Sequence, residues 1–203
     1  MSNSEMPARK PVRFLGVSLS SLLEVDGEEP QLDLPIRDRP VETTYILTAE
    51  MDPESFAWLE RLRQQHFPPE RNLLPAHLTM FHHLSSAQTT RLDDFEVPDG
   101  PVPILLSAPI LLGSGVAIRI RSAELERLRT AARQAMSGEF SKQDSQGWRP
   151  HVTIQNKVPI ETAKELYRTI EIGFEQSAGA VTGLLLWEYL GGPWQRVRRL
   201  PFA

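Results

Sequence analysis

Two short segments of this chain share a pattern of histidine, apolar residue, threonine and apolar residue. They are residues 77–80 (HLTM) and residues 151–154 (HVTI). The chain has only 5 histidines, so a chance repeat of this pattern is improbable. In an extended strand the side chains of residues i and i+2 share one face, so each segment presents an imidazole and a hydroxyl together. The apolar residues of both segments then face a core.

The two imidazoles predict acid–base chemistry. Because an unperturbed imidazole titrates at about pH 6.5, one of two histidines facing a phosphate can accept a proton while the other donates one. This pair suits in-line displacement at phosphorus, with protons moving from the attacking oxygen and to the departing ribose oxygen. We expect His77 and His151 to be catalytic, with the acid and the base unassigned. We expect Thr79 and Thr153 to bind the non-bridging phosphate oxygens.

The paired motifs resemble those of the 2H phosphoesterase superfamily, and within it the 2′-5′ RNA ligase (LigT-like) and cyclic phosphodiesterase branch. The resemblance spans about residues 41–203 and depends on residues 75–84 (PAHLTMFHHL), residues 148–158 (WRPHVTIQNKV) and a closing segment over residues 184–202. It implies an α+β fold of two duplicated lobes. Their antiparallel sheets would bound a central cleft, with helices outside and one motif from each lobe facing the cleft.

The same resemblance implies a metal-independent phosphoesterase without a cofactor. Its substrates would be 2′,3′-cyclic phosphate or 2′-5′ phosphodiester groups of RNA ends or small nucleotides. Ligation, opening of a cyclic phosphate and hydrolysis of a 2′-5′ linkage remain open, because one acid–base pair could serve each reaction. The alternative is a catalytically degenerate module with the same fold that binds RNA or a nucleotide. Since both motifs are intact, we favour the enzyme.

A metallohydrolase is a third hypothesis, because His66, His82 and His83 lie near His77 in the sequence. No carboxylate falls at a recognised ligand spacing among them. Adjacent residues of a strand also point to opposite faces, which separates His82 from His83. We therefore expect no metal site, and a metal-dependent enzyme would lose its activity with chelators.

Other residues near the motifs are candidates for substrate contacts. Arg149 lies two residues before His151 and is the preferred additional phosphate ligand, although a solvated arginine at the start of a strand is an equal alternative. Phe81 and Gln155 continue the two motif faces, so we expect one lobe to present an apolar surface and the other a polar surface. The three tryptophans at positions 148, 187 and 194 could stack a base, but tryptophan is more often a core residue.

The sequence predicts a strand–helix–strand unit twice, and each unit ends on a histidine motif. Residues 43–48 form a β-branched and aromatic run, which predicts the first strand. Asp52 is an N-cap signal for the helix that follows, and the strand of His77 comes after this helix. In the second unit Ser122 caps a helix that leads to the strand of His151. The remaining predicted elements are strands over residues 104–106 and 116–121, a helix over residues 160–174 and a hairpin around residues 191–193.

Length and composition predict one domain with an extension. At 203 residues with 40% apolar and 24% charged residues, the chain can bury a sizeable core. Residues 1–40 are polar and rich in proline, so we expect an N-terminal extension there and a single domain over residues 41–203.

The charge of the chain restricts its partners. A net charge of −4 argues against a broad surface that coats nucleic acid, so an RNA end or a small nucleotide is the expected partner. The chain has no cysteine, no apolar run that could span a bilayer and no clear signal-peptide cleavage site. We expect a cytoplasmic monomer that does not associate with membranes.

Overall fold

The computed structural model describes residues 43–203, which contain seven strands and five α-helices. The strands are β1 (Thr44–Met51), β2 (Leu78–Leu84), β3 (Val102–Leu111), β4 (Val116–Arg121), β5 (His151–Gln155), β6 (Ser177–Tyr189) and β7 (Trp194–Pro201). The helices are α1 (Pro53–His66), α2 (Ser86–Thr90), α3 (Ala123–Met136), α4 (Lys142–Ser145) and α5 (Ile160–Ile172), with a short 3-10 helix, η1 (Pro69–Arg71). The predicted extension over residues 1–40 lies outside the described residues and stays a prediction.

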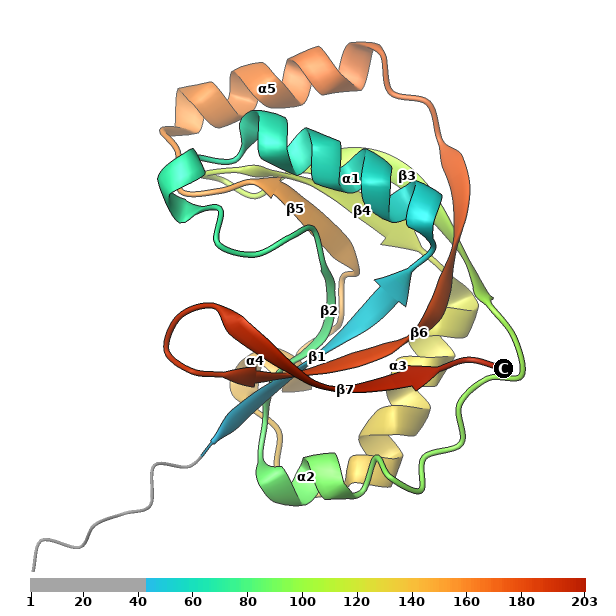
Figure 1. Cartoon of the computed structure of the whole chain (residues 1–203). Coiled ribbons are helices and arrows are strands. Elements are labelled where there is room, and N and C mark those ends of the chain that lie inside the picture. Colours follow the sequence, from blue (N-terminus) through green and yellow to red (C-terminus); the bar gives the residue numbers. More distant parts are fainter. Residues whose placement is uncertain (1–42) are drawn as a thin grey trace, which may run out of the picture. The chain divides into compact units, whose positions relative to one another are not determined.

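The strands form an antiparallel ring (Figure 1). Their order is β1-β2-β5-β4-β3-β6-β7, and an additional pairing of β1 with β6 closes the first six of them. The ring consists of two sheets that share β6. The start of β6 pairs with β3, whereas its second half lies between β1 and β7. The predicted α+β fold of two lobes is therefore confirmed.

The two sheets also meet at the two histidine motifs. β2 and β5 meet through one residue pair, Leu78 with Val152, which are the apolar residues that follow the two histidines. Leu78, Met80, Val152 and Ile154 are all fully buried. The alternation predicted within each motif is thus observed, and the two motifs lie side by side where the two sheets meet.

Helices α1 and α5 pack on the outside of one of the two sheets. α1 and α5 lie side by side over the sheet that contains β3, β4 and β5 (Figure 1). α1 follows β1 of one sheet but packs against β5 of the other. Asp52 caps its N-terminus by accepting hydrogen bonds from the backbone N–H groups of Glu54 and Ser55, and it also accepts one from the N–H of Ala180 in β6. None of the helices within residues 43–203 is long and apolar enough to span a bilayer.

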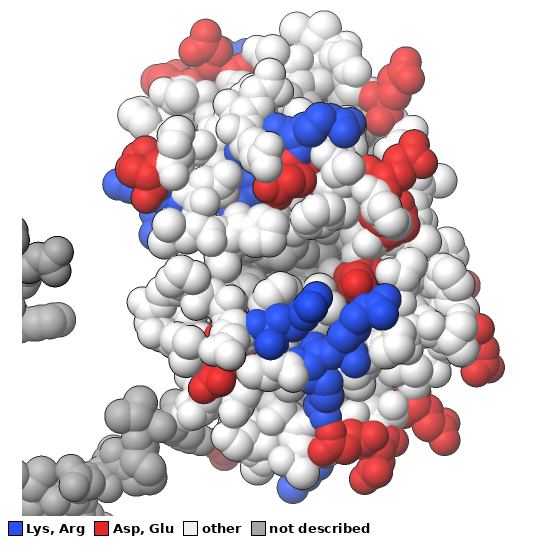
Figure 2. All heavy atoms as spheres, viewed as in Figure 1, with Lys and Arg blue, Asp and Glu red and all other residues white. Residues whose placement is uncertain are grey.

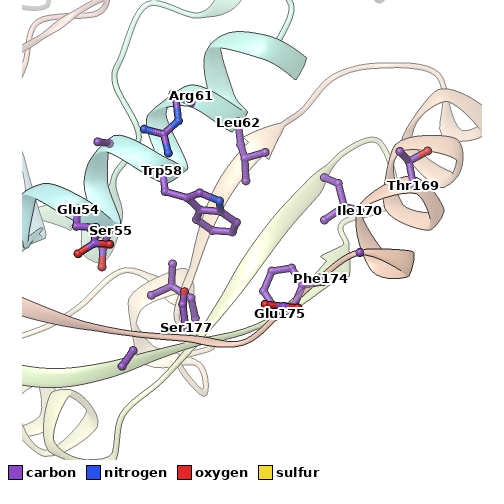
Figure 3. Close-up of a pocket in the computed structure, with 14 residues that line it drawn as sticks. Glu54, Ser55, Trp58, Arg61, Leu62, Thr169, Ile170, Phe174, Glu175 and Ser177 are labelled. Carbon is purple, nitrogen blue, oxygen red and sulfur yellow. The ribbon is translucent and has the colours of Figure 1, made fainter.

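A hollow of about 560 Å³ lies between α1 and α5 on the outside of the sheet (Figure 3). Trp58 of α1 and Phe174 meet there edge to face, with ring centroids 6.1 Å apart. Leu62 and Ile170 complete its apolar wall. None of the residues that line this hollow belongs to a histidine motif, so it is separate from the predicted chemistry.

Basic side chains gather over the lower half of the face shown in Figure 2, where β7 lies. β7 carries Arg196, Arg198 and Arg199. Arg198 forms an ion pair with Asp93, and Arg199 forms one with Glu50. Among the strands of residues 43–203, β7 pairs only with β6, so this charge protects an edge strand from pairing with further strands.

Candidate active site

Both histidine motifs open into one cleft of about 780 Å³. The five predicted site residues all line this cleft, namely His77, Thr79, Arg149, His151 and Thr153. The other lining residues are His82, Gln143, Gln146, Gly147, Trp148 and Trp194. Two motifs that are far apart in the sequence thus contribute matching groups to a single site.

The two motif imidazoles are held in the same way. Nδ1 of His77 lies 2.7 Å from the carbonyl oxygen of Pro75, and Nδ1 of His151 lies 2.7 Å from that of Arg149. A carbonyl oxygen can only accept a hydrogen bond, so Nδ1 carries the proton in both rings. Nε2 is therefore the nitrogen left for chemistry. It accepts a proton when the ring is neutral and donates one when the ring is charged.

The surroundings of His77 keep its ring neutral. Burial lowers the pKa of His77 to about 4 against the opposing effect of its hydrogen bond to Pro75, and three nearby basic side chains lower the pKa further. These side chains are Arg63, His82 and His151. Trp194 packs against the imidazole, with ring centroids 4.8 Å apart. At neutral pH His77 is thus uncharged and able to accept a proton.

α1 positions both motif strands from one side. The carboxylate of Glu60 accepts a hydrogen bond of 2.6 Å from the backbone N–H of Ala76, directly before His77. The buried guanidinium of Arg63 donates a hydrogen bond of 2.7 Å to the carbonyl oxygen of Thr153. Two side chains one helical turn apart therefore fix the backbone of both motifs.

A buried carboxylate connects the segment before β5 to β2. Asp144 is fully buried and accepts hydrogen bonds from the backbone N–H groups of His82 and His83 and from the hydroxyl of Ser141. Its Oδ1 also lies 3.1 Å from Nδ1 of His82. Burial alone would raise the pKa of Asp144, but these hydrogen bonds outweigh it and the pKa lies below its usual value. The carboxylate is therefore ionised at neutral pH.

Arg129 of α3 completes this connection. Its guanidinium donates hydrogen bonds of 2.8 Å and 3.0 Å to the backbone carbonyls of Met80 and Asp144. It also lies over the rings of Phe81 and Trp148, 4.5 Å and 5.3 Å from their centroids. The segment that leads to His151 is thereby held against β2.

Bulges in the motif strands overturn part of the sequence prediction. The register of β2 against β1 shifts twice within residues 45–48 of β1, and Phe81 is fully buried against Phe140 instead of facing a substrate. A similar register shift of β5 against β4 accompanies the burial of Gln155. The predicted apolar and polar surfaces were wrong, because bulges break the two-residue periodicity. His82, which we considered only as a metal ligand, lines the cleft.

The three candidate tryptophans have different positions. Trp148 lines the cleft and its Nε1 donates a hydrogen bond of 3.0 Å to the carbonyl of Thr79. Trp187 donates from Nε1 to the hydroxyl of Thr48 and lines an adjoining apolar hollow of about 470 Å³. Trp194 lines both spaces, so its indole forms part of the wall between them.

The charged side chain that lines the cleft is basic, and none of the lining side chains is acidic. Arg149 is exposed, and within residues 43–203 it has no carboxylate partner at ion-pair distance. Across that same part of the chain, no group of three or more histidine, aspartate or glutamate side chains is placed to hold a metal ion. The cleft suits an anionic ligand.

Comparisons with known proteins agree with this architecture. The family model of the 2′-5′ RNA ligase superfamily matches residues 51–193. The crystal structure of E. coli LigT complexed with 3′-AMP aligns with a TM-score of 0.54 and 17% identity, over 80% of this chain and 99% of that chain. A crystal structure of a phosphoesterase gives 0.53 and 18%, with the same coverage. The protein TT0787 of Thermus thermophilus gives 0.57 and 14%, over 78% and 97%. No curated protein sequence matches significantly.

Proposed function

The chain belongs to the 2′-5′ RNA ligase superfamily, and on this premise we propose that it is a metal-independent phosphoesterase. Its substrates would carry a 2′,3′-cyclic phosphate or a 2′-5′ phosphodiester group, at an RNA end or in a small nucleotide. The observation that supports this best is the pair of imidazoles with matching bonds at Nδ1 and an available Nε2. A phosphoryl group in the cleft would meet one histidine from each lobe.

In this proposal His77 is the general base and His151 the general acid. The lowered pKa of His77 makes it the neutral acceptor, and its Nε2 takes the proton of the attacking water. The new P–O bond forms as the bond to the ribose oxygen breaks, and His151 delivers a proton from Nε2 to that oxygen. One water is consumed for each bond cleaved. The hydroxyls of Thr79 and Thr153 donate hydrogen bonds to the non-bridging oxygens.

The proposed ligand class follows from the charge of the cleft and from a relative. A lining without carboxylates and with Arg149 favours a phosphate-bearing ligand. The related LigT was crystallised with 3′-AMP. A ribonucleotide with phosphate at this edge of the ribose is therefore the ligand that we propose for the cleft.

The test is a panel of 2′,3′-cyclic nucleotides and 2′-5′-linked dinucleotides, incubated with EDTA and followed by chromatographic identification of the products. We expect hydrolysis that EDTA does not change. His77→Gln and His151→Gln should each lower kcat/KM by about two to four orders of magnitude, the usual contribution of a positioned proton transfer. The double variant should lose far less than the product of the two effects, because the two residues act as a unit.

Circular dichroism of each variant separates loss of chemistry from loss of folding. Near wild-type rates in a folded single variant, or inactivation by EDTA, would contradict the proposed mechanism. A wild type that binds 3′-AMP but turns over none of these substrates would indicate a nucleotide-binding module instead.

A further inference from the structure

The cleft contains one imidazole more than the acid–base chemistry needs. His82 lines the cleft, whereas the adjacent His83 lines a separate hollow with Ser85 and Arg91. His82 lies within β2, five residues after His77, which directly precedes this strand. The bulged register of β2 is what brings it into the cleft.

The ring of His82 is oriented by a buried charge. Its Nδ1 lies 3.1 Å from Oδ1 of the ionised Asp144, which can only accept a hydrogen bond. The side chain of His82 is 43% exposed, whereas that of Asp144 is completely buried. Nε2 is therefore the available nitrogen of His82. When the ring is protonated, Asp144 balances its charge and Nε2 can donate to an anion.

Further donors line the same cleft beyond the reacting pair. Arg149 is exposed and contributes a guanidinium, and the amides of Gln143 and Gln146 also line the cleft. In the proposed reaction, the two motif imidazoles and the two threonine hydroxyls already make all the contacts assigned to the scissile phosphoryl group. The imidazole of His82 and the guanidinium of Arg149 thus remain as groups that the proposed acid–base steps do not use.

We propose that His82 and Arg149 bind a second phosphate of the substrate, one that is not cleaved. The scissile group is the one in the proposed function, on which this inference rests. The preferred substrates are therefore nucleotides with a phosphate in addition to the scissile one. This second phosphate is either a terminal 5′-phosphate or the preceding phosphodiester of an RNA end, and both present the same anionic oxygens.

Kinetics with three substrates test this inference and distinguish the two sources. The substrates are adenosine 2′,3′-cyclic phosphate, its 5′-phosphorylated form, and a diadenosine with one internal phosphate and a terminal 2′,3′-cyclic phosphate. In the wild type, at least one of the two substrates with an additional phosphate should have a kcat/KM about tenfold higher than adenosine 2′,3′-cyclic phosphate. This factor is expected for a charge-assisted contact. His82→Gln should bring this ratio close to one. His83→Gln, the matched control outside the cleft, should keep it. A wild-type ratio of one, or an unchanged ratio in His82→Gln, would overturn the inference.

A binding measurement makes the result independent of turnover. Isothermal titration compares 3′-AMP with adenosine 3′,5′-bisphosphate, which adds one phosphate. The bisphosphate should bind about tenfold tighter to the wild type and to His83→Gln, and no tighter to His82→Gln. If the protein turns over no substrate but shows this difference, the proposed function fails and the second phosphate site stands. If it turns over cyclic phosphates but gains nothing from the additional phosphate in either assay, the inference fails alone.

Discussion

Trp194 should control the pH range of the proposed reaction through His77. Its indole packs 4.8 Å from the imidazole, and burial is the largest cause of the lowered pKa of His77. Trp194→Ala would admit water to the ring and stabilise its charged form. The pKa of His77 should then rise from about 4 toward its ordinary value of about 6.5. Because His77 acts as a base in the proposal, acid should inhibit this variant more strongly than the wild type.

The size of the effect follows from the two pKa values. At pH 5 an imidazole with a pKa of 4 is about 90% neutral, whereas one with a pKa of 6.5 is about 3% neutral. At the limit of full exposure, the ratio of kcat/KM at pH 5 to that at pH 7 should fall by about twentyfold relative to the wild type. This ratio compares two pH values within one variant, so a lost substrate contact that is independent of pH cancels.

The assay is kcat/KM on a 2′,3′-cyclic nucleotide between pH 4 and pH 9, with an NMR titration of the His77 ring assigned through His77→Gln. Trp58→Ala is the control, because it removes an indole from the hollow between α1 and α5, outside the cleft. In this control kcat/KM should fall at acid pH as it does in the wild type, and this fall is the acid limb of the pH profile. An acid limb that does not move in Trp194→Ala, or a wild-type His77 that titrates near its ordinary value, would refute the reasoning.

Two further predictions concern the support of the cleft and the phosphate contacts. Arg129→Met leaves the backbone carbonyls of Met80 and Asp144 without their donor, so urea denaturation should show a loss of about 2–4 kcal/mol in the free energy of unfolding. The exposed Arg127→Met should change it by less than about 0.5 kcal/mol, and equal losses in both would contradict the role of Arg129. Thr79→Val and Thr153→Val should each lower kcat/KM by about ten- to a hundredfold, which is less than the loss of a histidine. Unchanged steady-state kinetics in both variants would show that these hydroxyls do not contact the phosphate.

Local signals predicted the parts of the fold that depend on short stretches of sequence. The alternation of apolar and polar residues placed the half-buried His77 and His151 on one face of their segments and their apolar neighbours in the core. Asp52 marked the start of α1 correctly, because an N-cap acts on the N–H groups that follow it. The repeated motif also supported the symmetry of the two lobes that the family resemblance implied, and the apolar residues of both copies pack into one continuous core.

Long-range contacts left no such signal. His82 and Asp144 are 62 residues apart, and neither residue by itself indicates the other. Register shifts depend on the partner strand, so β2 alone could not show that His82 would replace Phe81 in the cleft. The first residues of β6, from Ser177 to Ala180, have little strand propensity and become a strand by pairing with β3.

The shared strand β6 also governs when the protein can fold during its synthesis. β6 begins only at Ser177, yet β1 and β3 both pair with it. A nascent chain that has left the ribosome up to α5 therefore exposes two open strand edges, which invite pairing with other chains. Pairs such as Thr44 with Tyr189 join almost the whole described chain, so they form late and slowly. The ring of strands therefore cannot close until β6 has been synthesised.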